Sequence, residues 1–110
     1  MQKMSLKKLN EIRDGTERAL LFMKGDDCHL CHQFEPIISS LEEDYKNDIK
    51  FFVCSNEYLE ISEELEEQIN GVPTVVLFGG GSYFVVPDPA VPDRASWYTR
   101  EYIDQFLKEW

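Results

Sequence analysis

The sequence predicts an α/β fold with a central mixed sheet of four strands and helices on both faces of the sheet. Residues 19–23 form a continuous apolar run, which suits a strand that is buried on both faces, and the largely apolar run of residues 49–54 indicates a second buried strand. Segments with apolar residues three and four positions apart lie between and after these runs, which is typical of helices with one buried face. A glycine run, residues 79–81, separates two more strand segments, as expected of a hairpin.

The first half of the chain predicts two helices and two strands. Ser5 is placed to cap a first short helix. The strand of residues 19–23 is followed by a polar loop and a helix over residues 28–45. Pro36 lies inside this helix and should kink it, because proline lacks an amide donor and clashes with the preceding turn. The strand of residues 49–54 then completes a right-handed βαβ unit.

The second half predicts two helices around a hairpin. A helix over residues 58–70 is followed by strands over residues 73–78 and 83–86, which should form an antiparallel pair. Residues 87–92 contain three prolines and should be an extended loop. Thr99 can cap a last helix that runs to the end of the chain.

The chain is short and acidic. At 110 residues it has room for one hydrophobic core, so residues 1–110 are expected to form a single, monomeric domain. A net charge of −10 repels nucleic acid and anionic membrane surfaces, so we expect neither as a partner. No apolar run is long enough for a signal peptide or membrane span, which predicts a cytoplasmic, reducing location. Three cysteines there indicate redox chemistry or metal binding and not a framework of structural disulfides.

Reactive side chains cluster in the sequence Cys28-His29-Leu30-Cys31-His32, where the first buried strand ends and the long helix begins. A cysteine at a helix N-terminus meets unpaired amide donors and the positive end of the helix dipole, which favour the thiolate. Cys28 is therefore the predicted nucleophile, and Cys31, one turn further along, is the predicted resolving thiol. The expected cycle is attack by Cys28 on a substrate disulfide, a mixed disulfide, and release when Cys31 attacks Cys28.

A proline motif accompanies the cysteine pair. Gly71-Val72-Pro73-Thr74 immediately precedes a strand, and together with the C-x-x-C pair it makes the chain resemble the thioredoxin and glutaredoxin superfamily from about residue 17 onward. The resemblance implies the thioredoxin fold, a cis peptide bond before Pro73, and binding of an extended substrate segment at Val72 and Pro73. It also implies a thiol–disulfide oxidoreductase without a cofactor. Its partners would be protein disulfides and a reductant, either a thioredoxin reductase-like protein or glutathione.

The chain departs from this resemblance next to the cysteines. Asp27 stands where thioredoxins usually have tryptophan, and the Gly-Pro pair usual between the cysteines is absent. The family's buried acid, which helps to deprotonate the resolving cysteine, falls near Phe22. The sequence leaves open whether Glu35, Asp26 or water takes the place of that acid, and it leaves the roles of the two histidines open as well.

A second resemblance concerns the residues before the pair. Phe22-Met23-Lys24-Gly25 looks like the lead-in of monothiol glutaredoxins, in which the lysine helps to hold glutathione. Lys24 is therefore a candidate substrate contact, and a glutathione-dependent, glutaredoxin-like reductase is the alternative function. The glutaredoxin G-G-x-D-D motif is absent, and the glycine run of residues 79–81 is better explained as the hairpin turn.

Three other interpretations of the chain stay open. Residues 28–32 also spell C-x-x-C-H, the attachment motif of c-type haem, which normally requires export. Both cysteines and a histidine could bind zinc, but no second ligand pair exists and we predict no metal. The chain could instead be a binding module that holds a partner with the proline-rich loop, Trp97 and Tyr98.

Cys54, at the end of a buried strand, is predicted to be an inert core thiol.

Overall fold

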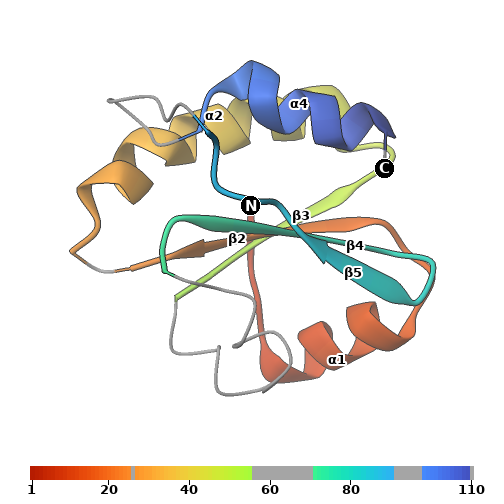
Figure 1. The fold of residues 1–110 in the computed structure, drawn as a ribbon. Coiled ribbons are helices and arrows are strands. Elements are labelled where there is room, and N and C mark those ends of the chain that lie inside the picture. The colour runs from red at the N-terminus through yellow and green to blue at the C-terminus, as the bar shows by residue number, and fades with distance from the viewer. Residues whose placement is uncertain (26, 56–70, 91–97, 110) are drawn as a thin grey trace.

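A five-stranded mixed sheet runs through the middle of the molecule (Figure 1). The computed structural model describes residues 1–25, 27–55, 71–90 and 98–109, and within them the strand order is β1-β3-β2-β4-β5. β1, β3 and β2 are parallel, whereas β4 runs antiparallel to β2 and β5 antiparallel to β4. The strands are β1 (Gln2–Lys3), β2 (Ala19–Lys24), β3 (Lys50–Ser55), β4 (Thr74–Gly79) and β5 (Ser82–Val85).

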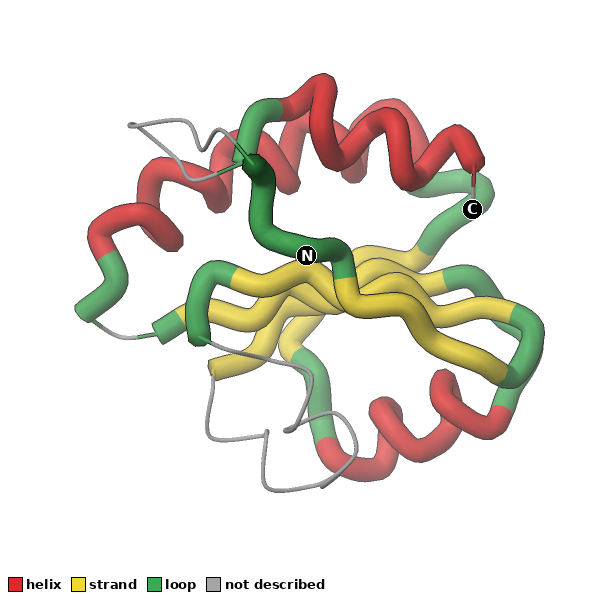
Figure 2. Tube along the Cα trace, viewed as in Figure 1, coloured by secondary structure: helices red, strands yellow, loops and turns green. Residues whose placement is uncertain are grey.

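Helices cover both faces of this sheet. α1 (Leu6–Asp14) lies on one face, while α2 (His29–Tyr45) and α4 (Arg100–Glu109) lie together on the other (Figure 2). The arrangement is the predicted fold class, an α/β fold with a mixed sheet between helices. In the part of the chain that the structure describes, no helix combines the length and the apolar character needed to cross a membrane.

The predicted elements agree with the described ones to within a residue or two. The four predicted strands correspond to β2, β3, β4 and β5, and α2 continues through Pro36. The predicted helix over residues 58–70 lies outside the described residues, as do residues 91 and 92 of the proline-rich loop and Trp110 at the end of the last helix.

The sheet has one strand more than the sequence predicted. β1 adds a fifth strand at the edge, where Gln2 and Lys3 pair with Phe52 and Val53 of β3. Both β1 residues are exposed. Two exposed residues carry no apolar alternation, and the pattern of side chains therefore could not reveal this strand.

The two faces of β2 carry two separate cores. Leu20 and Phe22 belong to the core under α2 and α4, whereas Ala19, Leu21 and Met23 belong to the core under α1. Successive side chains of a strand point to opposite faces, so a strand between two helical layers must be apolar at every position. This requirement explains the unbroken apolar run from which β2 was predicted.

The residues predicted to begin two helices and to form the hairpin turn do so in the structure. The Ser5 hydroxyl accepts a hydrogen bond from the Lys8 amide at 3.1 Å, and the Thr99 hydroxyl accepts one from the Tyr102 amide at 3.2 Å. Both are helix N-caps. Gly80 and Gly81 have φ angles of 60° and 79°, which the tight turn between β4 and β5 requires and which other residues rarely adopt.

Polar contacts hold α2 against α4 at the end of α2 far from the cysteines. The Tyr45 hydroxyl donates to the Asp104 carboxylate, and Arg100 forms an ion pair with Asp44. The Arg100 guanidinium also donates to the Ser40 hydroxyl at 3.2 Å. These contacts fix the orientation of α2. They therefore also fix where the N-terminus of α2, which carries the cysteine pair, lies beside the sheet.

Candidate active site at the start of helix α2

Cys28 is the N-cap of α2. It follows β2 with φ −91° and ψ 103°, an extended conformation, and its sulfur accepts a hydrogen bond from the Cys31 amide at 3.0 Å. The sulfur thus takes the place that a serine or aspartate oxygen takes in an ordinary N-cap. Amide donors and the helix dipole both favour negative charge at this sulfur.

The two cysteines of the C-x-x-C pair are joined and differ in exposure. Cys28 and Cys31 form a disulfide with their Cα atoms 5.2 Å apart. The Cys31 side chain is 1% exposed, whereas Cys28 is only partly buried. A partner can therefore reach Cys28 first, while Cys31 faces the core beneath it.

The bend before β4 lies beside Cys28. The Val72–Pro73 peptide bond is cis, Val72 is half-buried and Pro73 is buried. A β-carbon placed on Gly25 would come within 3.0 Å of the Val72 side chain and 3.6 Å of the Cys28 β-carbon. The bend and the nucleophile candidate are therefore close neighbours, with Gly25 between them.

Gly25 is a site residue that the sequence reasoning missed. Its missing side chain leaves the space in which Val72 approaches Cys28. The signal for it was present, since a glycine at the end of a strand often marks a close approach of another part of the chain. The partner in that approach lies far away in the sequence and only the fold identifies it.

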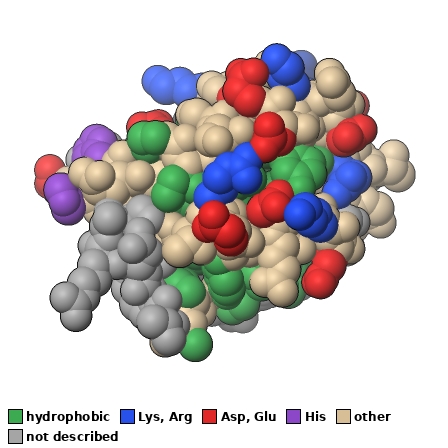
Figure 3. All heavy atoms as spheres, turned by 90° about the horizontal axis from the view of Figure 1, so that it is seen from above, with side chains coloured by type: hydrophobic (Ala, Val, Ile, Leu, Met, Phe, Trp, Pro, Cys, Tyr) green, Lys and Arg blue, Asp and Glu red, His purple; other side chains and the backbone are tan. Residues whose placement is uncertain are grey.

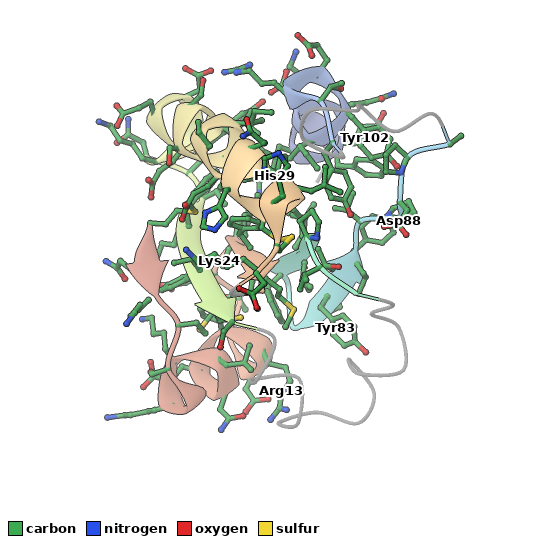
Figure 4. All side chains as sticks on the ribbon, turned by 90° about the vertical axis from the view of Figure 1, so that its left-hand side faces the viewer. Arg13, Lys24, His29, Tyr83, Asp88 and Tyr102 are labelled. Carbon is green, nitrogen blue, oxygen red and sulfur yellow. A yellow bond between two sulfur atoms is a disulfide. The ribbon has the colours of Figure 1, made fainter. Side chains whose placement is uncertain are left out.

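Lys24 is engaged with α2. Its ammonium group donates to the Glu35 carboxylate at 3.1 Å, and the two side chains are 36% and 34% exposed. Figure 4 shows Lys24 on the side of the molecule where α2 begins. A pair this exposed adds under about 1 kcal/mol to stability, so its importance is to join the end of β2 to the second turn of α2. Asp26, the other acid considered, lies outside the described residues.

The histidines next to the pair are exposed. His29 and His32 both lie on the surface, and the space-filling view shows the histidines together at one end of the molecule (Figure 3). Within residues 1–25, 27–55, 71–90 and 98–109, no group of three or more His, Cys, Asp or Glu side chains is placed to hold a metal ion.

The position of the family's buried acid is filled by an aromatic core. Phe22 is fully buried and meets Phe34 of α2 edge-on, with ring centroids 5.4 Å apart. Phe34 in turn packs on Tyr98 at 4.9 Å. The alternative of a binding module proposed a partner contact at Trp97 and Tyr98. The Tyr98 side chain is fully buried and is not accessible to a partner, and Trp97 lies outside the described residues.

The third cysteine, Cys54, differs from the pair because it is a free and buried thiol. Cys54 of β3 is a free thiol in the core under α1, and burial raises its pKa from an ordinary 9.0 to about 12. A thiol that keeps its proton is neither a nucleophile nor a metal ligand near neutral pH. The structure thus agrees with an inert core thiol.

The raised pKa of Cys54 predicts a fall in stability at alkaline pH. The unfolded chain releases this proton near pH 9.0 and the folded chain only near 12, so the stabilisation is complete below 9.0 and is lost as pH rises toward 12. We expect denaturant unfolding of the wild type, followed from about pH 8 to about pH 11, to show this loss. The Cys54→Ala variant should show a shallower decline. Equal declines in the two proteins would contradict the assignment.

Comparison with solved structures identifies the fold. The chain is similar to mitochondrial thioredoxin 3 from Saccharomyces cerevisiae in its oxidized form, with a TM-score of 0.71 and 16% identity over 100% of this chain and 95% of that chain. It is equally similar, at a TM-score of 0.71 and 15% identity with the same coverage, to a chain from a structure on thiol resolving in yeast mitochondrial 1-Cys peroxiredoxin via glutathione/thioredoxin systems. No protein-family model and no curated protein matches the sequence.

These similarities and the described architecture define a thioredoxin-fold protein. The predicted fold class is confirmed, since the mixed sheet with helices on both faces matches that of the solved structure over the whole of this chain. A C-x-x-C pair at the start of α2 on this fold supports thiol–disulfide redox chemistry in general terms.

Proposed function

We propose that this protein is a thiol–disulfide oxidoreductase that exchanges disulfides with other proteins through Cys28 and Cys31. The observation that carries the proposal is the asymmetry of the pair. Cys28 caps the helix and is partly accessible, and Cys31, bonded to it, is 1% exposed. Dithiol exchange needs one sulfur that a substrate can reach and a second that only the first can reach.

The proposed cycle moves two electrons from the protein to the substrate. In the reduced form, the Cys28 thiolate attacks one sulfur of a substrate disulfide, and the other substrate sulfur leaves with the electron pair of the broken bond. Cys31 then gives up its proton and attacks the Cys28 sulfur. The first substrate sulfur departs as a thiolate, and the Cys28–Cys31 disulfide is left on the protein.

The bend at Val72 and Pro73 is the proposed substrate contact. An extended segment on either side of a substrate cysteine could pair with the backbone there as an added strand does. The closeness of Gly25 to both Val72 and Cys28 supports this role, because a segment bound at the bend would lie near the attacking Cys28 sulfur. The partners proposed are protein disulfides and a cellular reductant that restores the dithiol, in a reducing, cytoplasmic compartment.

The mixed disulfide is the species that tests this proposal. In a Cys31→Ser, Cys54→Ser variant, Cys28 can attack a protein disulfide but nothing resolves the product. We expect a covalent complex of one protein chain with one substrate chain to accumulate, visible by mass spectrometry and dissolved by dithiothreitol. Cys28→Ser, Cys54→Ser is the matched control and should form none. A complex that forms equally with the control would contradict the proposal.

A further inference from the structure

Tyr98 touches three parts of the site although it lies outside the cysteine motif. It precedes α4, and its ring is fully buried between the rings of Phe34 in α2 and Tyr102 in α4. The ring centroids of Tyr98 and Phe34 are 4.9 Å apart, and those of Tyr98 and Tyr102 are 5.9 Å apart. Phe34 lies one turn beyond Cys31 on α2. The Tyr98 ring therefore supports the helix directly beneath the resolving cysteine.

The Tyr98 hydroxyl lies between two acceptors. It is 3.5 Å from the Pro73 carbonyl oxygen and 3.4 Å from a carboxylate oxygen of Asp88. One hydroxyl proton thus faces both the bend beside Cys28 and the loop that follows β5. A buried hydroxyl needs a partner, and a buried carbonyl that loses its donor is costly, so the contact with Pro73 constrains the bend.

A neighbouring tyrosine anchors the same loop by a different contact. The Tyr102 hydroxyl donates to the Pro87 carbonyl at 2.8 Å, and burial together with the Asp88 charge raises the Tyr102 pKa. Figure 4 shows Tyr102 and Asp88 on the same side of the molecule, beyond the start of α2. Tyr102 thus shares the aromatic stack and the loop contact of Tyr98, but its hydroxyl bonds to Pro87 and not to the bend.

We propose that Tyr98 is a positioning residue for disulfide exchange, which holds the Val72–Pro73 bend at the distance from Cys28 that an extended protein segment needs. This role rests on the proposed function. It acts through the Pro73 carbonyl and not on the reacting sulfurs. It therefore affects the binding of a substrate that uses the bend and leaves unaffected the reaction with a small disulfide that has no backbone to pair.

The test compares Tyr98→Phe with Tyr102→Phe on two substrates. Each variant loses one hydroxyl and keeps its ring. With insulin as the protein disulfide, we expect Tyr98→Phe to raise KM about twofold with kcat unchanged, the effect of one long hydrogen bond, and Tyr102→Phe to leave KM unchanged. With bis(2-hydroxyethyl) disulfide, both variants should react at the wild-type rate. Equal KM values in the two variants, or equal losses on both substrates, would overturn the proposal.

A second variant separates the bend from the loop. Asp88→Ala removes one competing acceptor and keeps the contact of the Tyr98 hydroxyl with the Pro73 carbonyl, so KM for insulin should remain at or below the wild-type value. A rise as large as that of Tyr98→Phe would show that the loop controls KM and would refute the role of Tyr98. A wild type that reduces neither substrate would instead refute the proposed function, so the two failures are distinguishable.

Discussion

Replacing Cys28 by serine is expected to lower the rate of protein-disulfide reduction by roughly a thousandfold or more, with the fold intact. A serine hydroxyl is not ionised at neutral pH and cannot attack sulfur to form a disulfide. Serine can still cap α2, because its oxygen accepts the Cys31 amide as the Cys28 sulfur does. The variant therefore removes the chemistry and preserves the structure that positions it.

The measurement is the rate of reduction of a protein disulfide with dithiothreitol as electron donor, together with thermal unfolding. Cys54→Ser is the matched control, since it also exchanges one sulfur for oxygen but in the core under α1. It should keep the wild-type rate and lose stability, because the substitution buries a hydroxyl in an apolar core that was not built to hydrogen-bond it. Full activity in Cys28→Ser would favour a thioredoxin-fold binding module over an enzyme.

The second large effect is on stability. We expect Phe34→Ala to lower the free energy of unfolding by about 4 kcal/mol, because it removes a fully buried ring from the core between β2 and α2. The ring also contacts Phe22 and Tyr98, and both lose a packing partner in the variant. Chemical unfolding followed by circular dichroism gives the change directly.

A phenylalanine near the surface provides the control. Phe84 of β5 is 37% exposed and meets Phe106 at 5.7 Å, so Phe84→Ala should cost about 1 kcal/mol, the value of a partly exposed aromatic contact. Similar losses in the two variants would show that the layer beneath the cysteine pair is no more tightly packed than the edge of the sheet. That result would contradict the view that tight packing around Phe34 holds Cys31 in position.

The fold was predictable because its strongest signals are local. β2 was visible as an unbroken apolar run, and the hairpin between β4 and β5 was visible as glycines in a tight turn. The cysteine pair was visible for the same reason, since the motif, the helix start and the preceding strand are contiguous in sequence. β1 was not visible, because its two residues are exposed and carry no apolar alternation.

The rest of the site could not be predicted because its contacts join distant residues. Nothing near Gly25 in the sequence indicates that Val72 will lie against it, and nothing near Tyr98 indicates that its hydroxyl will face Pro73. The Lys24–Glu35 pair was missed for a related reason. Both residues were singled out, Lys24 as an anion contact and Glu35 as a substitute acid, but their mutual pairing depends on how α2 packs beside β2.

The central place of β2 in the sheet affects which strands open first. β2 is hydrogen-bonded to β3 on one side and to β4 on the other, and its end leads directly into the cysteine pair. Edge strands fray first when a sheet opens locally, and the middle ones last. The cysteine pair thus follows a strand that is paired on both sides in the described sheet, and we expect transient opening at the edge strands β1 and β5 to leave β2 in place.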